Sequence, residues 1–142
     1  MRVEAKIIDL PKILDERGNL SFLEENRHIP FAIKRSYWIY DVPGGEYRGG
    51  HSYKINQEFI IALSGSFDVV LENGGKKTTF TLNRSYYGLY VPSNTWRSME
   101  NFSTNALALV LASTAYNADD YERDYDQFLK FSMNNDLYGD NL

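Results

Sequence analysis

The chain has 142 residues, with 15 Lys and Arg against 19 Asp and Glu, which gives a net charge of −4. This length suits one ordinary domain and leaves no room for a second independent core. A mildly acidic chain lacks the concentrated positive field that nucleic-acid binding needs, so we expect no nucleic-acid partner, although a few arginines can still hold a small anion. The absence of cysteine excludes disulfides, zinc–thiolate sites and thiol nucleophiles.

The apolar runs and the N-terminal segment give an expectation for the cellular location of the protein. No apolar run approaches the roughly 20 residues of a membrane span. The N-terminal segment carries acids early and lacks the apolar core of a signal peptide. We therefore expect a cytoplasmic protein that does not associate with a membrane.

Short runs rich in β-branched and aromatic residues fill most of the chain, with turn residues between them. Aromatic residues make up 15% of the sequence, which favours strands around a dry core. Asn73-Gly74-Gly75 is a strong hairpin signal. Many short strands joined by tight turns indicate a sandwich or barrel. The predicted strands span residues 5–10, 20–24, 31–42, 51–55, 59–63, 67–71, 77–82, 88–91 and 106–112.

The C-terminal part of the chain is the one segment with a helical pattern. Asn117 can cap a helix, and two aspartates follow in the first turn, where the helix dipole favours anions. Aromatic and apolar residues then recur at helical spacing, from Tyr121 to Leu129. We expect a single domain over residues 1–131 that includes a helix at about 118–131, followed by a polar tail over 132–142.

Two segments carry spacing typical of a known superfamily. Gly45 precedes His51 by six positions, Glu58 follows His51 by seven, and Gly65 follows Glu58 by seven. A second segment runs from Pro92 to Arg97, with Asn101 four positions further on. These segments resemble the two signature motifs of the cupins. The resemblance implies an all-β fold, a cupin jelly-roll barrel or sandwich, with the short C-terminal α-helix added.

The four positions that hold the metal in metal-dependent cupins are mostly altered in this chain. Three histidines and one glutamate would be usual there, and this sequence has His51, Tyr53, Glu58 and Arg97. A catalytic metal usually needs three protein ligands, and Arg97 places a permanent cation where the metal would lie. We therefore expect no metal and no other cofactor, and we expect Glu58 to pair with a nearby cation.

A narrower resemblance covers residues 3–131. Its motifs are Asp15-Glu16-Arg17-Gly18-Asn19-Leu20, Asp41-Val42-Pro43-Gly44-Gly45-Glu46, Arg48-Gly49-Gly50-His51, Trp96-Arg97 and Leu109-Val110-Leu111-Ala112-Ser113. In this order they resemble the dTDP-4-oxo-6-deoxyhexose 3,4-ketoisomerases, the small WxcM-like and FdtA-like cupins. Where that family has two histidines, this chain has His51 and Tyr53.

The resemblance implies an isomerase that turns a dTDP-linked 4-oxo-6-deoxyhexose into its 3-oxo isomer for deoxysugar and surface polysaccharide biosynthesis. It also implies a homodimer. Because an exposed edge strand tends to be covered, we expect the N-terminal strand to be exchanged between the two copies.

The chemistry of this reaction fits the residues at the motif positions. A 3,4-ketoisomerase removes a proton from C3 and returns one to C4 through an enediol or enediolate, and an imidazole that titrates near neutrality suits both steps. His51 is the predicted carrier of this proton. Tyr53 lies two positions along the same strand and therefore on the same face. We expect Tyr53, Tyr37 or Arg97 to donate to the developing oxyanion.

A sugar nucleotide also needs partners for its diphosphate and its base. Arginine side chains match phosphate oxygens, and Arg17 and Arg48 lie in the family-like segments. Arg35 shares the parity of Tyr37 on the predicted strand 31–42, and we expect this polar face to line the barrel interior. An aromatic ring should stack on the base, but the sequence does not choose among the tyrosines.

Two other functions stay open at this point. One is a sugar-nucleotide 3,5-epimerase, which shares the barrel and the proton abstraction. The other is a non-catalytic cupin that only binds a sugar nucleotide, in which Tyr53 marks the loss of activity.

Overall fold

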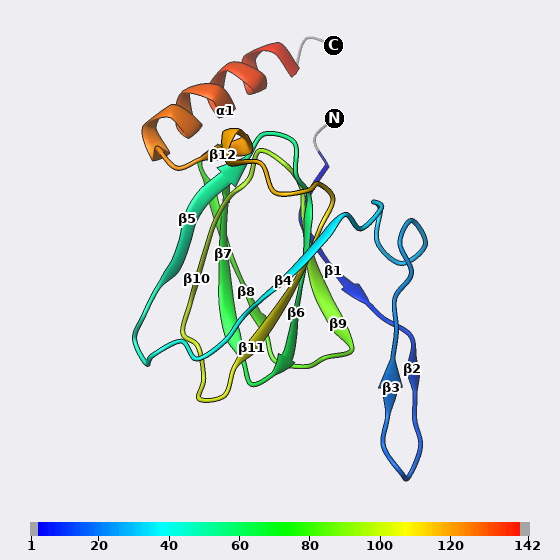
Figure 1. The fold of residues 1–142 in the computed structure, drawn as a ribbon. Coiled ribbons are helices and arrows are strands. Elements are labelled where there is room, and N and C mark those ends of the chain that lie inside the picture. The colour runs from blue at the N-terminus through cyan, green and yellow to red at the C-terminus, as the bar shows by residue number, and fades with distance from the viewer. Residues whose placement is uncertain (1–2, 140–142) are drawn as a thin grey trace.

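A computed structural model describes residues 3–139 of the chain, and the side chains of residues 3–132. Two five-stranded antiparallel sheets face each other, and one helix follows them in the chain (Figure 1). The predicted cupin-type fold is confirmed. The first sheet has the strand order β1 (Lys6–Asp9), β9 (Tyr87–Val91), β6 (Glu58–Ser64), β11 (Leu107–Ala112) and β4 (Arg35–Ile39). The second has the order β12 (Tyr121–Glu122), β5 (Arg48–Tyr53), β10 (Trp96–Glu100), β7 (Phe67–Asn73) and β8 (Lys76–Leu82).

The hydrophobic core has two parts, one on each face of the first sheet. Between the sheets, alternate residues such as Phe67, Val69 and Leu71 of β7 pack against inward residues of the opposite sheet. On the outer face of the first sheet, Phe59 and Ile61 of β6 belong to a second cluster with residues of the N-terminal segment. Strand β6 is therefore buried on both faces, which explains its uninterrupted apolar sequence.

The predicted hairpin is present between β7 and β8. Asn73 pairs with Lys76, and the two glycines between them form the turn. Gly74 and Gly75 both have positive φ, 61° and 80°, which is the backbone conformation that a tight two-residue hairpin loop requires and that glycine adopts without strain.

One strand, which carries Arg97, was not predicted from the sequence. Strand β10 lies between β5 and β7, and its register places Arg97 opposite His51. The segment Trp96-Arg97-Ser98-Met99-Glu100 lacks an apolar alternation, because Arg97 and Ser98 are both buried polar residues. Pairing with strands on both sides, rather than local pattern, makes this segment extended.

The predicted helix at 118–131 is wrong at both ends. Asn117 caps only a short 3₁₀ turn, Ala118–Asp120, and accepts a hydrogen bond from the Asp119 amide. The next two residues form β12, in which Tyr121 pairs with Tyr53 of β5. This pairing engages the backbone groups that a helix would need, so helix α1 begins only at Tyr125.

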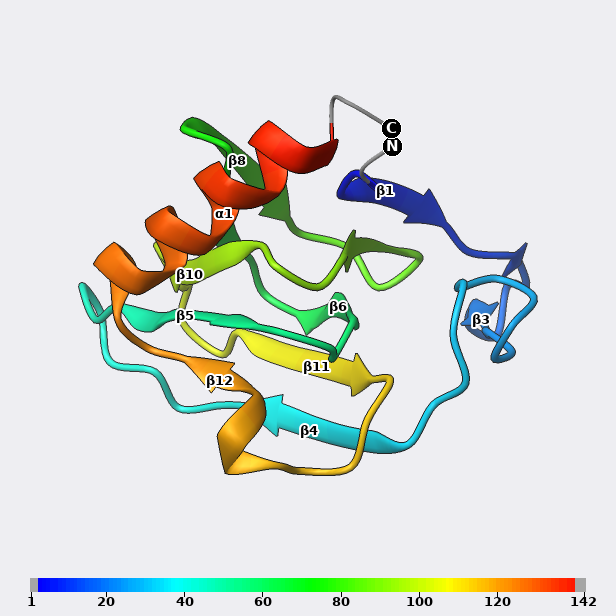
Figure 2. The ribbon, with the colours of Figure 1, turned by 90° about the horizontal axis from the view of Figure 1, so that it is seen from above.

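Helix α1 spans Tyr125–Gly139 and continues through most of the segment predicted as a polar tail. Residues 140–142 of that tail lie outside the described residues. Phe128 is buried and packs its ring on Trp96, so that α1 lies over the β5 and β10 side of the second sheet (Figure 2). Among residues 3–139, no helix is both long and apolar enough to cross a membrane.

A small separate sheet lies near the N-terminus. Strands β2 (Lys12–Ile13) and β3 (Leu20–Ser21) form a hairpin that projects away from the barrel (Figure 1). Its apolar side chains Ile13, Leu14 and Leu20 are 54%, 73% and 54% exposed, so the described residues leave more than half of each uncovered.

Asp120 fastens the segment before α1 to the barrel. Its carboxylate is buried and accepts hydrogen bonds from the backbone amides of Ile55, at 2.8 Å, and Asn56, at 3.0 Å. Its carbonyl accepts a further bond from the Lys54 amide. These contacts hold β12 against the end of β5, beside His51 and Tyr53.

We predict that Asp120→Ala lowers the free energy of unfolding by about 2–4 kcal/mol, because one buried and one partly buried amide lose their carboxylate acceptor. Urea denaturation would measure the change. Asp119→Ala removes the same charge from an exposed neighbouring side chain and serves as the control, with an expected effect under about 0.5 kcal/mol. Equal effects of the two variants would contradict the role of Asp120.

Candidate active site

A cavity of about 520 Å³ lies inside the barrel and is lined by both sheets. It contains six of the seven residues that the sequence singled out. Described residues that line it are Arg35, Tyr37, Trp38, Ile39, Arg48, Gly49, His51, Tyr53, Glu58, Ile60, Arg97, Met99, Val110, Tyr116, Tyr121 and Arg123. Strand β4 turns Arg35, Tyr37 and Ile39 inward, as the predicted parity required.

Arg17 is the exception. It lies in the connection between β2 and β3, where its guanidinium pairs with Asp15 at 2.9 Å and its side chain is 90% exposed. The hairpin points away from the barrel (Figure 1), so Arg17 does not reach the cavity of its own chain. Arg17 therefore does not lie with the other predicted site residues of the same chain. The sequence does not show in which direction the hairpin projects, so it could not predict this.

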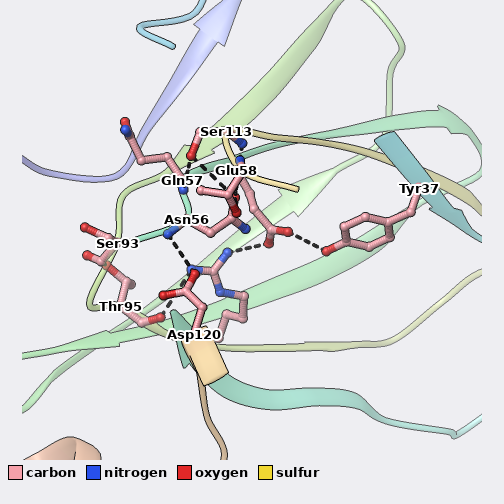
Figure 3. Close-up of polar contacts among 10 residues, drawn as sticks. Tyr37, Asn56, Gln57, Glu58, Ser93, Thr95, Ser113 and Asp120 are labelled. Carbon is pink, nitrogen blue, oxygen red and sulfur yellow. Dashed lines mark hydrogen bonds and ion pairs between the residues drawn. The ribbon is translucent and has the colours of Figure 1, made fainter. Parts of the chain in front are cut away.

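A buried ion pair joins the two sheets at the cavity wall. Arg97 Nη1 of β10 lies 2.6 Å from Glu58 Oε1 of β6, and the two side chains are 4% and 1% exposed. The second carboxylate oxygen accepts a hydrogen bond from the Tyr37 hydroxyl at 2.6 Å (Figure 3). Glu58 thus pairs with a cation, as expected, and it also holds the hydroxyl of Tyr37, which lies on β4 of the same sheet.

Two tyrosines of the cavity stay protonated at neutral pH. Burial raises the pKa of Tyr37 far above its usual value, and the Glu58 charge raises it further. Burial likewise raises the pKa of Tyr53, whose ring lies under the Arg97 guanidinium at 4.8 Å. Both hydroxyls can therefore act as hydrogen-bond donors or acceptors, but not as bases.

His51 is held as a neutral imidazole. Its ring contacts Tyr53 edge-on, with centroids 4.9 Å apart, and lies 5.2 Å from the ring of Tyr121. Burial lowers the pKa of His51 from 6.5 to about 3, and the charges of Arg97 and Arg123 add to this effect. Its buried Nε2 has no hydrogen-bond partner among the described residues. A neutral imidazole with a free nitrogen in a cavity can accept a proton from a ligand.

Two other unpartnered atoms lie in the same cavity wall. Among the described residues, Arg35 Nε and Arg97 Nε are buried without a hydrogen-bond acceptor. Buried donors of this kind are rare in folded proteins unless a ligand or water satisfies them. Together with His51 they form a set of two donors and one proton acceptor.

The structure adds cavity residues that sequence reasoning missed. Tyr121 was placed in a helix, and Arg123 was not considered. Both reach the cavity because β12 pairs with β5. A strand of two residues has no sequence pattern, so only the fold could reveal them.

The cavity offers little to a metal. No group of three His, Asp or Glu side chains suited to a metal ion occurs within the described part of the chain. The Glu58 carboxylate is already shared between Arg97 and Tyr37. The absence of a metal or cofactor in the working protein stays a prediction.

Comparisons with known proteins give consistent matches over most of the chain. The model of the FdtA family, described as WxcM-like, C-terminal, matches residues 3–133. The TDP-4-oxo-6-deoxy-alpha-D-glucose-3,4-oxoisomerase of Aneurinibacillus thermoaerophilus is 43% identical over 129 residues, which cover 91% of this chain and 93% of that protein.

Solved structures match equally well. A 3,4-ketoisomerase from Helicobacter canadensis superposes with a TM-score of 0.89 at 42% identity, covering 93% of this chain and 99% of that one. The sugar 3,4-ketoisomerase QdtA of Thermoanaerobacterium thermosaccharolyticum, in complex with TDP, gives a TM-score of 0.91 at 34% identity, covering 94% and 98%. A histidine-to-asparagine mutant of QdtA has been solved with TDP-4-keto-6-deoxyglucose.

We predict that Arg97→Met destabilises the protein by about 3–5 kcal/mol at pH 7, because Glu58 is left as a buried carboxylate without its cation. Urea denaturation at pH 7 would measure the change.

The double variant Glu58→Leu/Arg97→Met is the control for this prediction. Replacing both charges by apolar side chains of similar volume should recover most of the lost stability. A single variant that costs under about 1 kcal/mol would show that the pair is not the buried contact described above.

Proposed function

The chain belongs to the FdtA family of WxcM-like proteins, and we propose that it is a 3,4-ketoisomerase that converts a TDP-linked 4-oxo-6-deoxyhexose into its 3-oxo isomer. The predicted family resemblance is confirmed by the match to residues 3–133 and by the relative at 43% identity. The observation that carries the activity is the neutral His51 imidazole, whose Nε2 has no partner among the described residues of a cavity rich in arginine.

The proposed mechanism follows from the positions of three side chains. His51 accepts the C3 proton, and the electron pair of the C3–H bond forms the C3–C4 double bond of an enediolate. Negative charge moves to the C4 oxygen, where the unpartnered Nε–H of Arg97 is the available donor. The neutral Tyr53 hydroxyl, which is hydrogen-bonded to Tyr121, can turn to add a second bond. Protonated His51 then returns its proton to C4.

The hydroxyl proton must move as well, from the C3 oxygen to the C4 oxygen. Tyr37 suits this transfer because it lines the cavity and stays protonated. Its hydroxyl donates to Glu58 in the free protein, so it must turn from this carboxylate to pass its proton to the C4 oxygen and take the proton from the C3 oxygen. The atoms then balance without an oxidant or a cofactor.

Substrate binding is assigned to the cations near the opening. Arg48 is exposed and Arg35 is partly buried, and neither has a carboxylate partner among the described ion pairs. We assign the diphosphate of the sugar nucleotide to these two arginines, whose planar side chains match phosphate oxygens. The reaction belongs to cytoplasmic deoxysugar and polysaccharide biosynthesis, because sugar nucleotides are built from nucleoside triphosphates there.

We further infer a homodimer in which the N-terminal segment reaches the partner copy. Strand β1 pairs with β9 of its own chain, so the segment available for exchange is the projecting β2–β3 hairpin. Its exposed Ile13, Leu14 and Leu20 need cover. Arg17, at the end of this hairpin, would then bind substrate only in the partner's cavity.

We predict that His51→Asn lowers turnover of TDP-4-keto-6-deoxyglucose by about a hundred-fold or more, because asparagine cannot carry the proton. The assay is solvent-proton exchange in deuterated buffer, followed by NMR. The wild type should place deuterium at C3 or C4.

The same assay separates the alternatives. Exchange at C5 would indicate a 3,5-epimerase, and binding with neither exchange nor formation of the 3-oxo sugar would indicate a non-catalytic sugar-nucleotide-binding cupin. A His51→Asn variant that turns over at the wild-type rate would reject His51 as the proton carrier.

We predict a dimer in sedimentation velocity at micromolar concentration. Leu14→Asp should shift the protein toward monomer, because the hairpin can no longer be covered by an apolar partner surface. Leu63→Asp is the matched control, since Leu63 is an exposed leucine of β6 at 44% exposure, outside the hairpin. A wild type that sediments only as monomer would refute the dimer.

A further inference from the structure

Arg123 lies at the cavity wall and has no carboxylate partner among the residues whose side chains are described. It follows β12, lines the cavity and is exposed. Its guanidinium stacks on the ring of Tyr121, 4.5 Å from the centroid, and Tyr121 in turn packs against Tyr53 and His51. None of the ion pairs among the described residues includes Arg123.

The described side chains that line the cavity carry a net positive charge. Four arginines and one carboxylate line it, and the carboxylate is paired with Arg97. Three cations, Arg35, Arg48 and Arg123, therefore have no counter-charge among the described lining residues. A diphosphate carries the negative charges and the oxygen acceptors that such a group of arginines would bind.

We propose that Arg123 is a substrate-binding residue that takes a phosphate of the sugar nucleotide and thereby couples diphosphate binding to the proton affinity of His51. The coupling acts at short range, through the stack of Arg123 on Tyr121 and Tyr121 on His51. This inference rests on the proposed sugar-nucleotide substrate.

Besides His51, nine described residues that line the cavity are charged or titratable. These are Arg35 and Tyr37 on β4, Arg48 and Tyr53 on β5, Glu58 on β6, Arg97 on β10, Tyr121 on β12, and Tyr116 and Arg123 in the adjoining segments. The tyrosines are neutral, and Arg97 is compensated by Glu58. A phosphate on Arg123 therefore removes an uncompensated positive charge beside His51.

The consequence concerns the strength of His51 as a base. In the free protein, burial, Arg97 and Arg123 lower its pKa to about 3, which makes it a weak base at neutral pH. A general base works best when its pKa lies near the working pH. Bound diphosphate cancels the Arg123 charge and raises the pKa of His51, so the imidazole becomes a stronger base only once substrate is in place.

NMR titration of the histidine ring protons tests this coupling directly. The chain has two histidines, so the His51 signal can be assigned by its loss in His51→Asn. TDP is the probe, and thymidine, which lacks the diphosphate, is the ligand control. We expect TDP to raise the pKa of His51 by at least about one unit, a tenfold change in proton affinity, and thymidine to leave it unchanged. The His28 signal should not respond to TDP.

Variants separate the role of Arg123 from a general change of charge. Arg123→Gln should weaken TDP binding by about tenfold and should largely abolish the TDP-induced shift of His51. Arg123→Lys keeps the charge and should retain part of both effects. Arg84→Gln removes the same charge from an exposed site outside the cavity lining, and it should behave as wild type.

The possible outcomes are distinct. TDP binding that leaves the His51 titration unchanged overturns the coupling and leaves the proposed function standing. Wild-type affinity for TDP in Arg123→Gln shows that Arg123 does not bind phosphate. Failure of the wild type to bind TDP overturns the proposed function and this inference together.

Discussion

The buried pair between Glu58 and Arg97 is the interaction on which the site depends. Both side chains are almost fully buried in a mainly apolar barrel, so neither charge is tolerable without the other. The pair ties β6 of one sheet to β10 of the other, and through Tyr37 it also fixes β4. It uses the carboxylate that would bind a metal in a metal-dependent cupin. The cavity is thus equipped for proton transfer between organic groups.

The same pair adds to the effect of burial on the pKa values of its neighbours. Arg97 lies opposite His51 in the paired strands, and Glu58 accepts a hydrogen bond from Tyr37. A cation next to an imidazole and an anion next to a phenol both favour the neutral forms of those groups. In the proposed mechanism, the neutral imidazole accepts a proton and the neutral phenol exchanges one. The two opposite charges of the pair thus add to burial in keeping two side chains neutral on opposite walls of one cavity.

Prediction from the sequence was correct for side chains whose relative position depends only on their spacing along one strand. His51 and Tyr53 share a face, and Arg35 and Tyr37 share another, because side chains alternate along every strand. It failed where structure depends on pairing between distant segments. Strand β10 is extended by its two neighbours, and β12 by the alignment of Tyr121 with Tyr53 and by the carboxylate of Asp120. Local propensity around Asn117 favoured a helix, and these tertiary contacts overrode it.

The arginines that line the cavity differ in burial, and the cost of an unpaired positive charge rises with burial. Arg97 is buried and needs a permanent partner, which Glu58 supplies. Arg48 and Arg123 are exposed, so water can solvate them until a ligand arrives, and their charge costs little in the empty cavity. A sugar nucleotide has the matching polarity, with its anionic diphosphate at one end and an uncharged sugar at the other. For the proposed substrate, this difference in depth favours an orientation with the sugar toward His51 and the phosphates toward the exposed arginines.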